Sequence, residues 1–481
     1  MIKNDKYQVV IGLEVHTQLL TKSKLFCGDS AAFGAVPNTH ISPITLAHPG
    51  TLPRMNKEVI EYALKLGLAL HCDIEQQNYF ARKNYFYPDL PKGYQVSQHT
   101  TPICKNGTVR IRTGETERHI RLNRIHIEED AGKSLHEQDE LYTAIDLNRA
   151  GVPLLEIVSE PDLHSSEEAF AYVTELRRLV RWLHICDGNM EEGSMRCDAN
   201  ISIRLKDDAK LGTRVEVKNL NSIRNVKRAI DFEVNRLIDI VESGEKVLQQ
   251  TRSYDADNNT TFSLRSKEEA DDYRYFADPD LTPFNITDEF LQRVKASLPA
   301  LPEELEKKYK TVFHLPDYDA QVICGDKALA DFFEAIIQHT TNYKAAVNWL
   351  MGPVKSYLNE KDIDISSFPL SPQKISALIQ LVDDGKVNFS IASSKIFTTL
   401  LASPEKTPLQ IATLLNLLQE TDTGSVEAWV DEVMAKMPDK IKEYKSGKKG
   451  LIGLFVGEVK KLSKGKADMN LVNKLLAKKL N

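Results

Sequence analysis

The sequence lacks several features that would assign it to a familiar functional class. No apolar run approaches the roughly 18 residues that a membrane-spanning helix needs, so we expect no membrane partner. The first residues lead directly into a strand pattern without a secretory or transit signal, which favours a cytoplasmic protein. Neither GxxxxGK[ST] nor GxGxxG occurs, which argues against a P-loop or a Rossmann nucleotide site.

Cysteine chemistry is equally limited. The six cysteines are scattered along the chain and include no CxxC pair. This argues against a disulfide framework and against a thiolate metal site, and free thiols in a reducing compartment are expected instead.

The length of 481 residues suggests two to four domains. Charge is distributed unevenly along the chain. Residues 440–481 contain twelve lysines and three acids, a net charge of +9. Because the whole chain carries −6, the preceding residues carry −15. A basic tail on an acidic body suggests contact with a polyanion, although a solvated basic helix end gives the same pattern.

Two segments near the N-terminus predict strands with one polar face. Residues 7–19 alternate so that Glu14 and His16 are neighbours on that face. Residues 121–133 place His126 with Glu128 in the same way and end in a run of acids.

The stretch from Asp146 to Leu163 places one of its carboxylates, that of Glu156, inside an apolar run. Because a lone buried carboxylate costs several kcal/mol, Glu156 must be paired, bound to a cation or protonated. Pro153 and Pro161 limit the run to a short strand.

Two later segments repeat the design. Residues 188–205 place Arg196, Asp198 and Asn200 on one face, and residues 213–221 do so with Glu216 and Lys218. An antiparallel sheet with one face in water would also show this alternation of polar and apolar residues. However, acidic residues together with Arg, His and Asn on successive strands are typical of a surface that binds Mg²⁺ and phosphate. Imidazole is a poor Mg²⁺ ligand, which suggests a supporting or acid–base role for His16.

Capping residues mark the starts of three predicted helices. Asn56 precedes an apolar helical pattern, and Ser165 with Glu168 forms a capping box before another. Either Asn221 or Ser222 caps a third helix that runs to about Ser243.

The remaining segments are less specific. Residues 81–98 mix tyrosines with basic residues, a pattern that suits a base and its phosphates or the packing of a long loop. From about residue 300 the apolar period becomes helical, which is typical of a scaffold or binding module.

Long motifs in order resemble the B-subunit family of bacterial aspartyl/glutamyl-tRNA amidotransferases. They include IGLEVHTQL, RKNYFYPDLPKGYQVSQ, HIEEDAGKS, LNRAGVPLLEIVSEPD, MEEGSMRCDANIS, VEVKNLNS, DDYRYF and SKGKADMNLVNKLL. The resemblance implies an α+β fold with a catalytic cradle on a mainly antiparallel sheet (1–292), a helical domain (293–405) and a basic helical tail domain (406–481).

The resemblance also implies a heterotrimer with an amidase A subunit and a small C subunit. The B subunit would bind misacylated Glu-tRNA(Gln) or Asp-tRNA(Asn) and use ATP and Mg²⁺ to phosphorylate the side-chain carboxylate. Ammonia from the amidase would then give the amide. A tRNA-binding scaffold without chemistry of its own is the alternative.

Candidate residues follow from the motifs and from strand faces. The predicted metal ligands are Glu14, Glu156 and at least one of Glu128 and Glu129. Strand alternation favours Glu128, whereas the family pattern favours Glu129. The predicted catalytic residues are Glu14, His16, Glu156, Arg196 and Lys218. Nucleotide contacts are predicted for Lys83, Asn84, Tyr85, Ser194, Arg196, Asp198, Lys218, Asn219 and Arg265, and tRNA contacts for Lys448, Lys449, Lys461, Lys464 and Lys466.

One departure concerns zinc. Many members of the resembled family carry CxC and CxxC in the loop after the first strand. Here those positions are Cys27–Gly28–Asp29 and Ser42–Pro43–Ile44–Thr45, so three of four ligands are missing and we predict no zinc.

Overall fold

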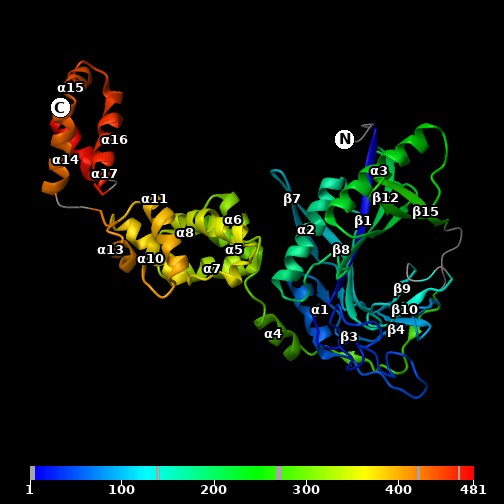
Figure 1. The fold of residues 1–481 in the computed structure, drawn as a ribbon. Helices are drawn as coiled ribbons and strands as arrows, with labels where there is room; N and C mark the ends of the chain where they lie inside the picture. Colours follow the sequence, from blue (N-terminus) through cyan, green and yellow to red (C-terminus); the bar gives the residue numbers. More distant parts are fainter. Residues whose placement is uncertain are drawn as a thin grey trace. The chain divides into compact units, whose positions relative to one another are not determined.

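A computed structural model describes residues 6–136, 139, 141–266, 273–419, 423–463 and 466–480, with the backbone alone at positions 219, 265, 266 and 423. The chain divides into two compact units, Met1–Leu301 and Pro302–Asn481. The first unit combines sheets with helices and the second is helical (Figure 1), which confirms the predicted α+β class.

The first unit is built on a ten-stranded sheet with the order β15-β14-β13-β12-β1-β11-β8-β6-β2, and β7 pairs with β8. Every pairing is antiparallel except that between β13 and β14. The strands are β1 (Tyr7–Gln18), β2 (Asp73–Ile74), β6 (Cys104–Lys105), β7 (Thr108–Thr113), β8 (Thr116–Glu129), β11 (Pro153–Ser159), β12 (Met195–Leu205), β13 (Val215–Leu220), β14 (Gln250–Asp255) and β15 (Thr260–Ser266).

Three small sheets complete the strands of this unit. One has three strands in the order β16-β4-β5, and the others pair β9 with β10 and β3 with β17. Their bounds are β3 (Gln77–Asn78), β4 (Ala81–Asn84), β5 (Tyr94–Ser97), β9 (Lys133–Leu135), β10 (Ala144–Asp146), β16 (Phe276–Ala277) and β17 (Phe284–Asn285).

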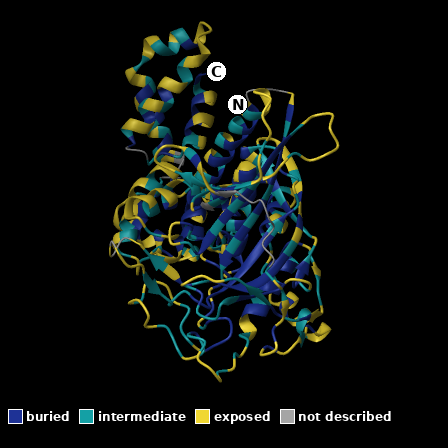
Figure 2. Cartoon of the chain, turned by 90° about the vertical axis from the view of Figure 1, so that its right-hand side faces the viewer, coloured by how far each residue is buried: buried dark blue, intermediate teal, exposed yellow. Residues whose placement is uncertain are grey.

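Helices cover the apolar face of the large sheet. α1 (Lys57–Ala69) packs on β8, α2 (Ser166–Trp182) on β7, and α3 (Ile223–Glu242) on β12, with α2 and α3 side by side (Figure 1). The short α4 (Asp288–Ala296) contacts α1. Alternate residues of β1 and β12 enter the shared core, so the central strands are among the most buried parts of the chain (Figure 2). The polar residues of the same strands point to the opposite face of the sheet, away from the helices that cover the apolar face, and can form a site there.

The predicted helix starts are confirmed, with one difference in detail. Asn56 caps α1 and Ser222 caps α3, each through its side chain. At α2 the Ser165 hydroxyl accepts from the Glu168 N–H at 3.1 Å, as expected for a capping box. However, the Glu168 carboxylate accepts from the N–H of His164 at 2.7 Å, one residue before the cap.

In the described part of the second unit, all of the named secondary-structure elements are helices. Helices α14 to α17 pack around their own apolar core, which includes Val430, Phe455 and Leu476. None of the described helices combines the length and the apolar composition needed to cross a bilayer. The helices are α5 (Pro302–Thr311), α6 (Asp317–Ile323), α7 (Lys327–Ile337), α8 (Tyr343–Trp349), α9 (Lys355–Lys361), α10 (Pro372–Asp383), α11 (Phe389–Ile391), α12 (Phe397–Ala402), α13 (Pro408–Leu414), α14 (Thr423–Lys436), α15 (Pro438–Lys445), α16 (Ile452–Leu462) and α17 (Met469–Leu480).

Candidate active site

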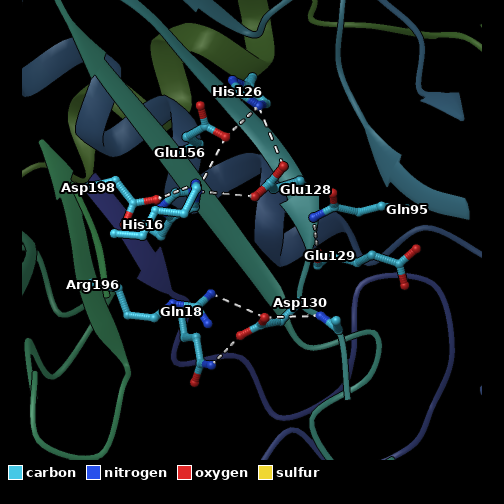
Figure 3. A network of polar contacts seen from close by, with 12 residues as sticks. His16, Gln18, Gln95, His126, Glu128, Glu129, Asp130, Glu156, Arg196 and Asp198 are labelled. Carbon is cyan, nitrogen blue, oxygen red and sulfur yellow. Dashed lines mark hydrogen bonds and ion pairs between the residues drawn. The ribbon is translucent and has the colours of Figure 1, made fainter. Parts of the chain in front are cut away.

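Strand β1 is the centre of the site because it carries Glu14 and His16 on its polar face. Antiparallel pairing places His16 opposite Glu156 of β11 on one side and opposite Arg196 of β12 on the other. Glu14 lies opposite Asp198 in the β12 register. Side chains from strands far apart in the sequence therefore meet on one face of the sheet (Figure 3).

Two histidines and two glutamates form the first cluster, at the junction of β1, β11 and β8. His16 Nε2 lies 3.4 Å from a Glu156 oxygen and 3.6 Å from a Glu128 oxygen. His126 Nε2 lies 3.4 Å and 3.7 Å from the same two carboxylates. The dashed contacts in Figure 3 show both imidazoles bridging both acids. His126, Glu128 and Glu156 are buried, so the cluster is shielded from solvent.

The cluster is electrostatically balanced. Burial alone would lower the pKa of His126, but the charges of Glu156 and Glu128 raise it to about 9. Burial also opposes protonation of His16, whereas its contact with Glu156 raises its pKa. Despite burial, the two imidazolium groups hold the pKa of Glu156 well below its usual range. Glu156 is therefore paired with two imidazoles, and this pairing favours its ionised form.

The second group is acidic and lies beside the first along β1. It consists of Glu14, Asp198 and Glu216. Lys218 Nζ lies 3.0 Å from Asp198 and 2.9 Å from Glu216, and Asn200 donates to Glu14 at 2.8 Å. Burial, and then the neighbouring charge of Glu156, raise the pKa of Glu14. Although burial favours the neutral amine, Asp198 and Glu216 raise the pKa of Lys218.

Asp130 and Gln18 form a third set with Arg196, and sequence reasoning missed both of them. The Arg196 guanidinium donates to Asp130 Oδ1 at 3.1 Å, and the Gln18 amide donates to Asp130 Oδ2 at 2.6 Å. Although burial opposes ionisation, Arg196 and Arg149 lower the pKa of Asp130. Gln18 could have been found, because it shares the polar face of Glu14 and His16 on β1.

Glu129 lies apart from both acidic groups. Its carboxylate accepts from Lys92 at 2.6 Å and from the backbone N–H of Val96 at 2.7 Å. Burial is the main cause that raises its pKa. The structure thus brings Glu128, and not Glu129, to His16 and Glu156 (Figure 3).

The predicted nucleotide contacts occupy different surroundings. Lys83 Nζ lies 4.8 Å from the ring centre of Tyr273, and Glu128 raises its pKa although burial would lower it. The Tyr85 hydroxyl donates to Gln95 at 3.4 Å. The Asn84 amide donates to three backbone carbonyls, at positions 82, 273 and 274.

The other nucleotide candidates are only partly described. Ser194 donates to Asp187 at 3.2 Å and so lies in a local loop contact. The side chains of Asn219 and Arg265 lie outside the described residues, although their backbones belong to β13 and β15.

The predicted tRNA-binding lysines lie in the second unit. Lys448 pairs with Glu443 at 3.1 Å, and Lys449 lies 4.4 Å from the ring centre of Tyr444. Lys461 is exposed, Lys466 is half-buried, and Lys464 lies outside the described residues.

Among the described residues, two groups have donor atoms close enough together to hold a metal ion. Their donor atoms lie within 4.8 Å of one another in each case. Glu14, Asp198 and Glu216 offer oxygen only, which is the donor set that Mg²⁺ prefers. His16, Glu128 and Glu156 mix nitrogen with oxygen and suit a transition metal as well.

The loop positions considered for zinc are linked by hydrogen bonds. The Cys27 thiol donates to Asp29 at 3.3 Å and lies 3.5 Å from the Thr45 hydroxyl. Thr45 also donates to Asp29, so one carboxylate joins both parts of the loop. The absence of zinc stays a prediction.

Comparison with known proteins places these features in a family. The profile of the GatB/GatE catalytic domain matches residues 9–292, and that of the GatB domain matches residues 331–480. Proteins named as the B subunit of aspartyl/glutamyl-tRNA(Asn/Gln) amidotransferase are similar over nearly the full length. The protein of Geotalea daltonii is 48% identical, and the match covers 99% of this chain and 99% of the relative. That of Chlorobium limicola is also 48% identical, over 99% of this chain and 100% of the relative. That of Syntrophotalea carbinolica is 46% identical, over 99% of each chain.

The resemblance seen in the motifs is thus confirmed over both units of the structure. The chain belongs to the GatB/GatE family.

Proposed function

We propose that this chain is the tRNA-binding, carboxylate-activating component of an aminoacyl-tRNA amidotransferase and that its substrate is Glu-tRNA(Gln) or Asp-tRNA(Asn). Support comes from one observation above all. The segment that matches the catalytic-domain profile carries imidazole and carboxylate groups from five strands on one face of its sheet. A scaffold that only held tRNA would have no need for so many desolvated charges.

The proposed reaction has two steps. A carboxylate oxygen of the aminoacyl group attacks the γ-phosphorus of ATP, and the bond to the ADP leaving group breaks. Ammonia then attacks the acyl carbon, inorganic phosphate leaves, and the nitrogen loses a proton to give the amide. Because water would hydrolyse the acyl phosphate, a site screened from solvent suits this chemistry.

The residues of this chain would bind, orient and neutralise the reactants. Lys218, Arg196 and Lys83 carry positive charge near the acidic groups and suit phosphate oxygens. Glu14, Asp198 and Glu216 would hold Mg²⁺, and His16, Glu128 and Glu156 form a second candidate set. When bound, Mg²⁺ supplies neutralisation of phosphate charge. His16, which lies between two acids, is in place to hold or move a proton.

The partners and the division of labour are part of the same proposal. An amidase A subunit would supply ammonia from glutamine through an internal channel, and a small C subunit would complete a heterotrimer. Within the chain we assign catalysis to 1–292, a connecting helical role to 293–405 and tRNA binding to 406–481. The lysines of the tail would contact phosphates, which accounts for the basic charge of that segment.

The test is ATP hydrolysis that depends on Glu-tRNA(Gln), measured on the assembled complex. We expect Glu156→Gln and Glu14→Gln to reduce the rate by at least about a hundredfold, because each removes a charge at the reacting centre. Glu117→Gln, on the outer part of β8, is the control and should leave the rate unchanged. Undiminished turnover in both active-site variants would leave the chain with a tRNA-holding role only.

A further inference from the structure

Asp130 directly follows β8, and its side chain is only 5% exposed. One carboxylate oxygen, Oδ1, accepts from Arg196 Nη2 at 3.1 Å and from the backbone N–H of Ala131 at 3.0 Å. The other, Oδ2, accepts from the Gln18 amide at 2.6 Å (Figure 3) and lies 3.7 Å from Arg149 Nε. Because partners on both oxygens stabilise the buried charge, the carboxylate has a fixed position and direction.

The two arginines beside Asp130 use their donors differently. Arg149 donates to the backbone carbonyls of Ala131 and Gly132 at 2.9 and 2.6 Å, so it fastens the loop that follows β8. Arg196 makes one hydrogen bond to the described part of the chain, the one to Asp130. A guanidinium has five N–H donors, so most of those of Arg196 stay available, and its side chain is 29% exposed. Arg149 thus serves the loop, whereas Arg196 presents donors that a ligand can use.

Arg196 lies within reach of both acidic parts of the site. It pairs opposite His16 in the register of β1 and β12, on the polar face. The charge of Asp130, followed by those of Glu128 and Asp198, raises the pKa of Arg196, although burial would lower it. Glu128 belongs to the first cluster and Asp198 to the acidic group, so the guanidinium lies within electrostatic range of both.

The contact between Arg196 and Asp130 differs from a closed ion pair. Elsewhere in the unit, Arg121 binds Asp162 through two N–H groups, at 2.8 and 2.7 Å, and so uses one edge of its guanidinium completely. Arg196 uses Nη2 alone on Asp130. A single bond from Nη2 leaves at least one guanidinium edge with both parallel N–H groups, the arrangement that fits two phosphate oxygens.

We propose that Asp130 is a positioning residue that aims the Arg196 guanidinium at the phosphate groups of ATP, with Gln18 fixing Asp130 in turn. An arginine side chain has many rotamers, and the bond to Asp130 restricts it to few of them. The side-chain entropy that nucleotide binding would otherwise cost is therefore already lost on folding. The inference rests on the proposed function, which supplies the phosphate, and it assigns Asp130 no contact with the nucleotide itself.

A double-mutant cycle on the assembled complex tests the proposal, with kcat/KM for ATP measured in hydrolysis that depends on Glu-tRNA(Gln). We expect Arg196→Met to lower kcat/KM at least about a hundredfold and Asp130→Asn at least about tenfold. In the Arg196→Met background, Asp130→Asn should cost less than about twofold, because no guanidinium is left to aim. Asp162→Asn, which weakens the surface pair with Arg121, is the matched control and should leave kcat/KM unchanged. An equal loss from Asp130→Asn in both backgrounds, or no loss in the parent, would overturn the proposal.

Gln18→Met covers the case in which Asp130→Asn does not fold. It removes the 2.6 Å hydrogen bond to Asp130 but keeps both charges of the ion pair. We expect a loss of at least about threefold in kcat/KM in the parent and none in the Arg196→Met background. An unchanged kcat/KM in the parent would refute the positioning role.

Failure of the proposed function has a different signature. The parent complex would then hydrolyse no ATP in response to Glu-tRNA(Gln), or Glu156→Gln would leave hydrolysis undiminished, and this inference would fall with it. Full activity in Arg196→Met would remove Arg196 from the phosphate site and overturn the inference alone. The same holds where Glu156→Gln abolishes hydrolysis while Asp130→Asn costs as much with Arg196 as without it.

Discussion

Replacing Lys218 with methionine tests whether the acidic group along β1 is a divalent-cation site. Lys218 is the cation that neutralises Asp198 and Glu216, at 3.0 and 2.9 Å. Methionine keeps most of the apolar stem but removes the charge. The three carboxylates of Glu14, Asp198 and Glu216 are then left close together without this positive partner, so a bound cation becomes more favourable.

The magnitude follows from the burial of Lys218. Removing one partner of a buried ion pair costs about 3–5 kcal/mol, and an exposed pair is worth about 0–1 kcal/mol. The Lys218 side chain is 33% exposed, so we expect a loss of about 2 kcal/mol in the free energy of unfolding when chelator is present. Mg²⁺ at about 100 times its dissociation constant would restore about 2.7 kcal/mol.

Urea unfolding with EDTA or with MgCl₂ measures both effects. Replacing Trp349 and Trp429 with phenylalanine leaves Trp182 as the only tryptophan, so fluorescence reports on the first unit. We expect Mg²⁺ to stabilise Lys218→Met more than the parent. Lys210→Met, in an exposed loop, serves as the matched control. Equal stability in EDTA, or equal gains from Mg²⁺ in variant and parent, would refute the reasoning.

Three further predictions concern caps, edge charges and the tail. Ser222→Ala should lower the free energy of unfolding by about 1 kcal/mol, because it removes the N-cap of α3; urea unfolding checks this, and no loss would contradict it. The Glu117 side chain is 41% exposed, and its pKa is lowered to about 2 by Arg110 and then by Arg112. The ionised carboxylate therefore stabilises the folded state above about pH 4.5, and this contribution is lost as the pH falls towards 2. Glu117→Gln should therefore cost under about 1 kcal/mol at pH 7 and less at pH 3 in thermal unfolding, and a cost that grew on acidification would have the wrong sign. Alanine at Lys448, Lys461 or Lys466 should each reduce the salt dependence of tRNA binding, measured by filter binding at several KCl concentrations, by about 0.7–0.9 in the log–log slope; an unchanged slope would remove that residue from the interface.

Local rules were sufficient for much of the fold. A period of two along residues 7–18 and 195–205 was enough to predict strands with one polar face, and caps at Asn56 and Ser222 marked helix starts. These features depend on neighbours in the chain, which is why a single sequence reveals them. The acids of the resembled motifs lie on the face that alternation predicted, with Glu128 rather than Glu129 beside His16.

The sequence by itself thus determined which side chains share a face, because alternation is a property of one strand. Only the tertiary structure decided which strands are neighbours and in what register. Placing β1 between β11 and β12 divides the predicted acids into two groups, with His16 and Glu156 in one and Glu14 and Asp198 in the other. Strand order and register arise from packing between segments more than 100 residues apart, which no local pattern encodes.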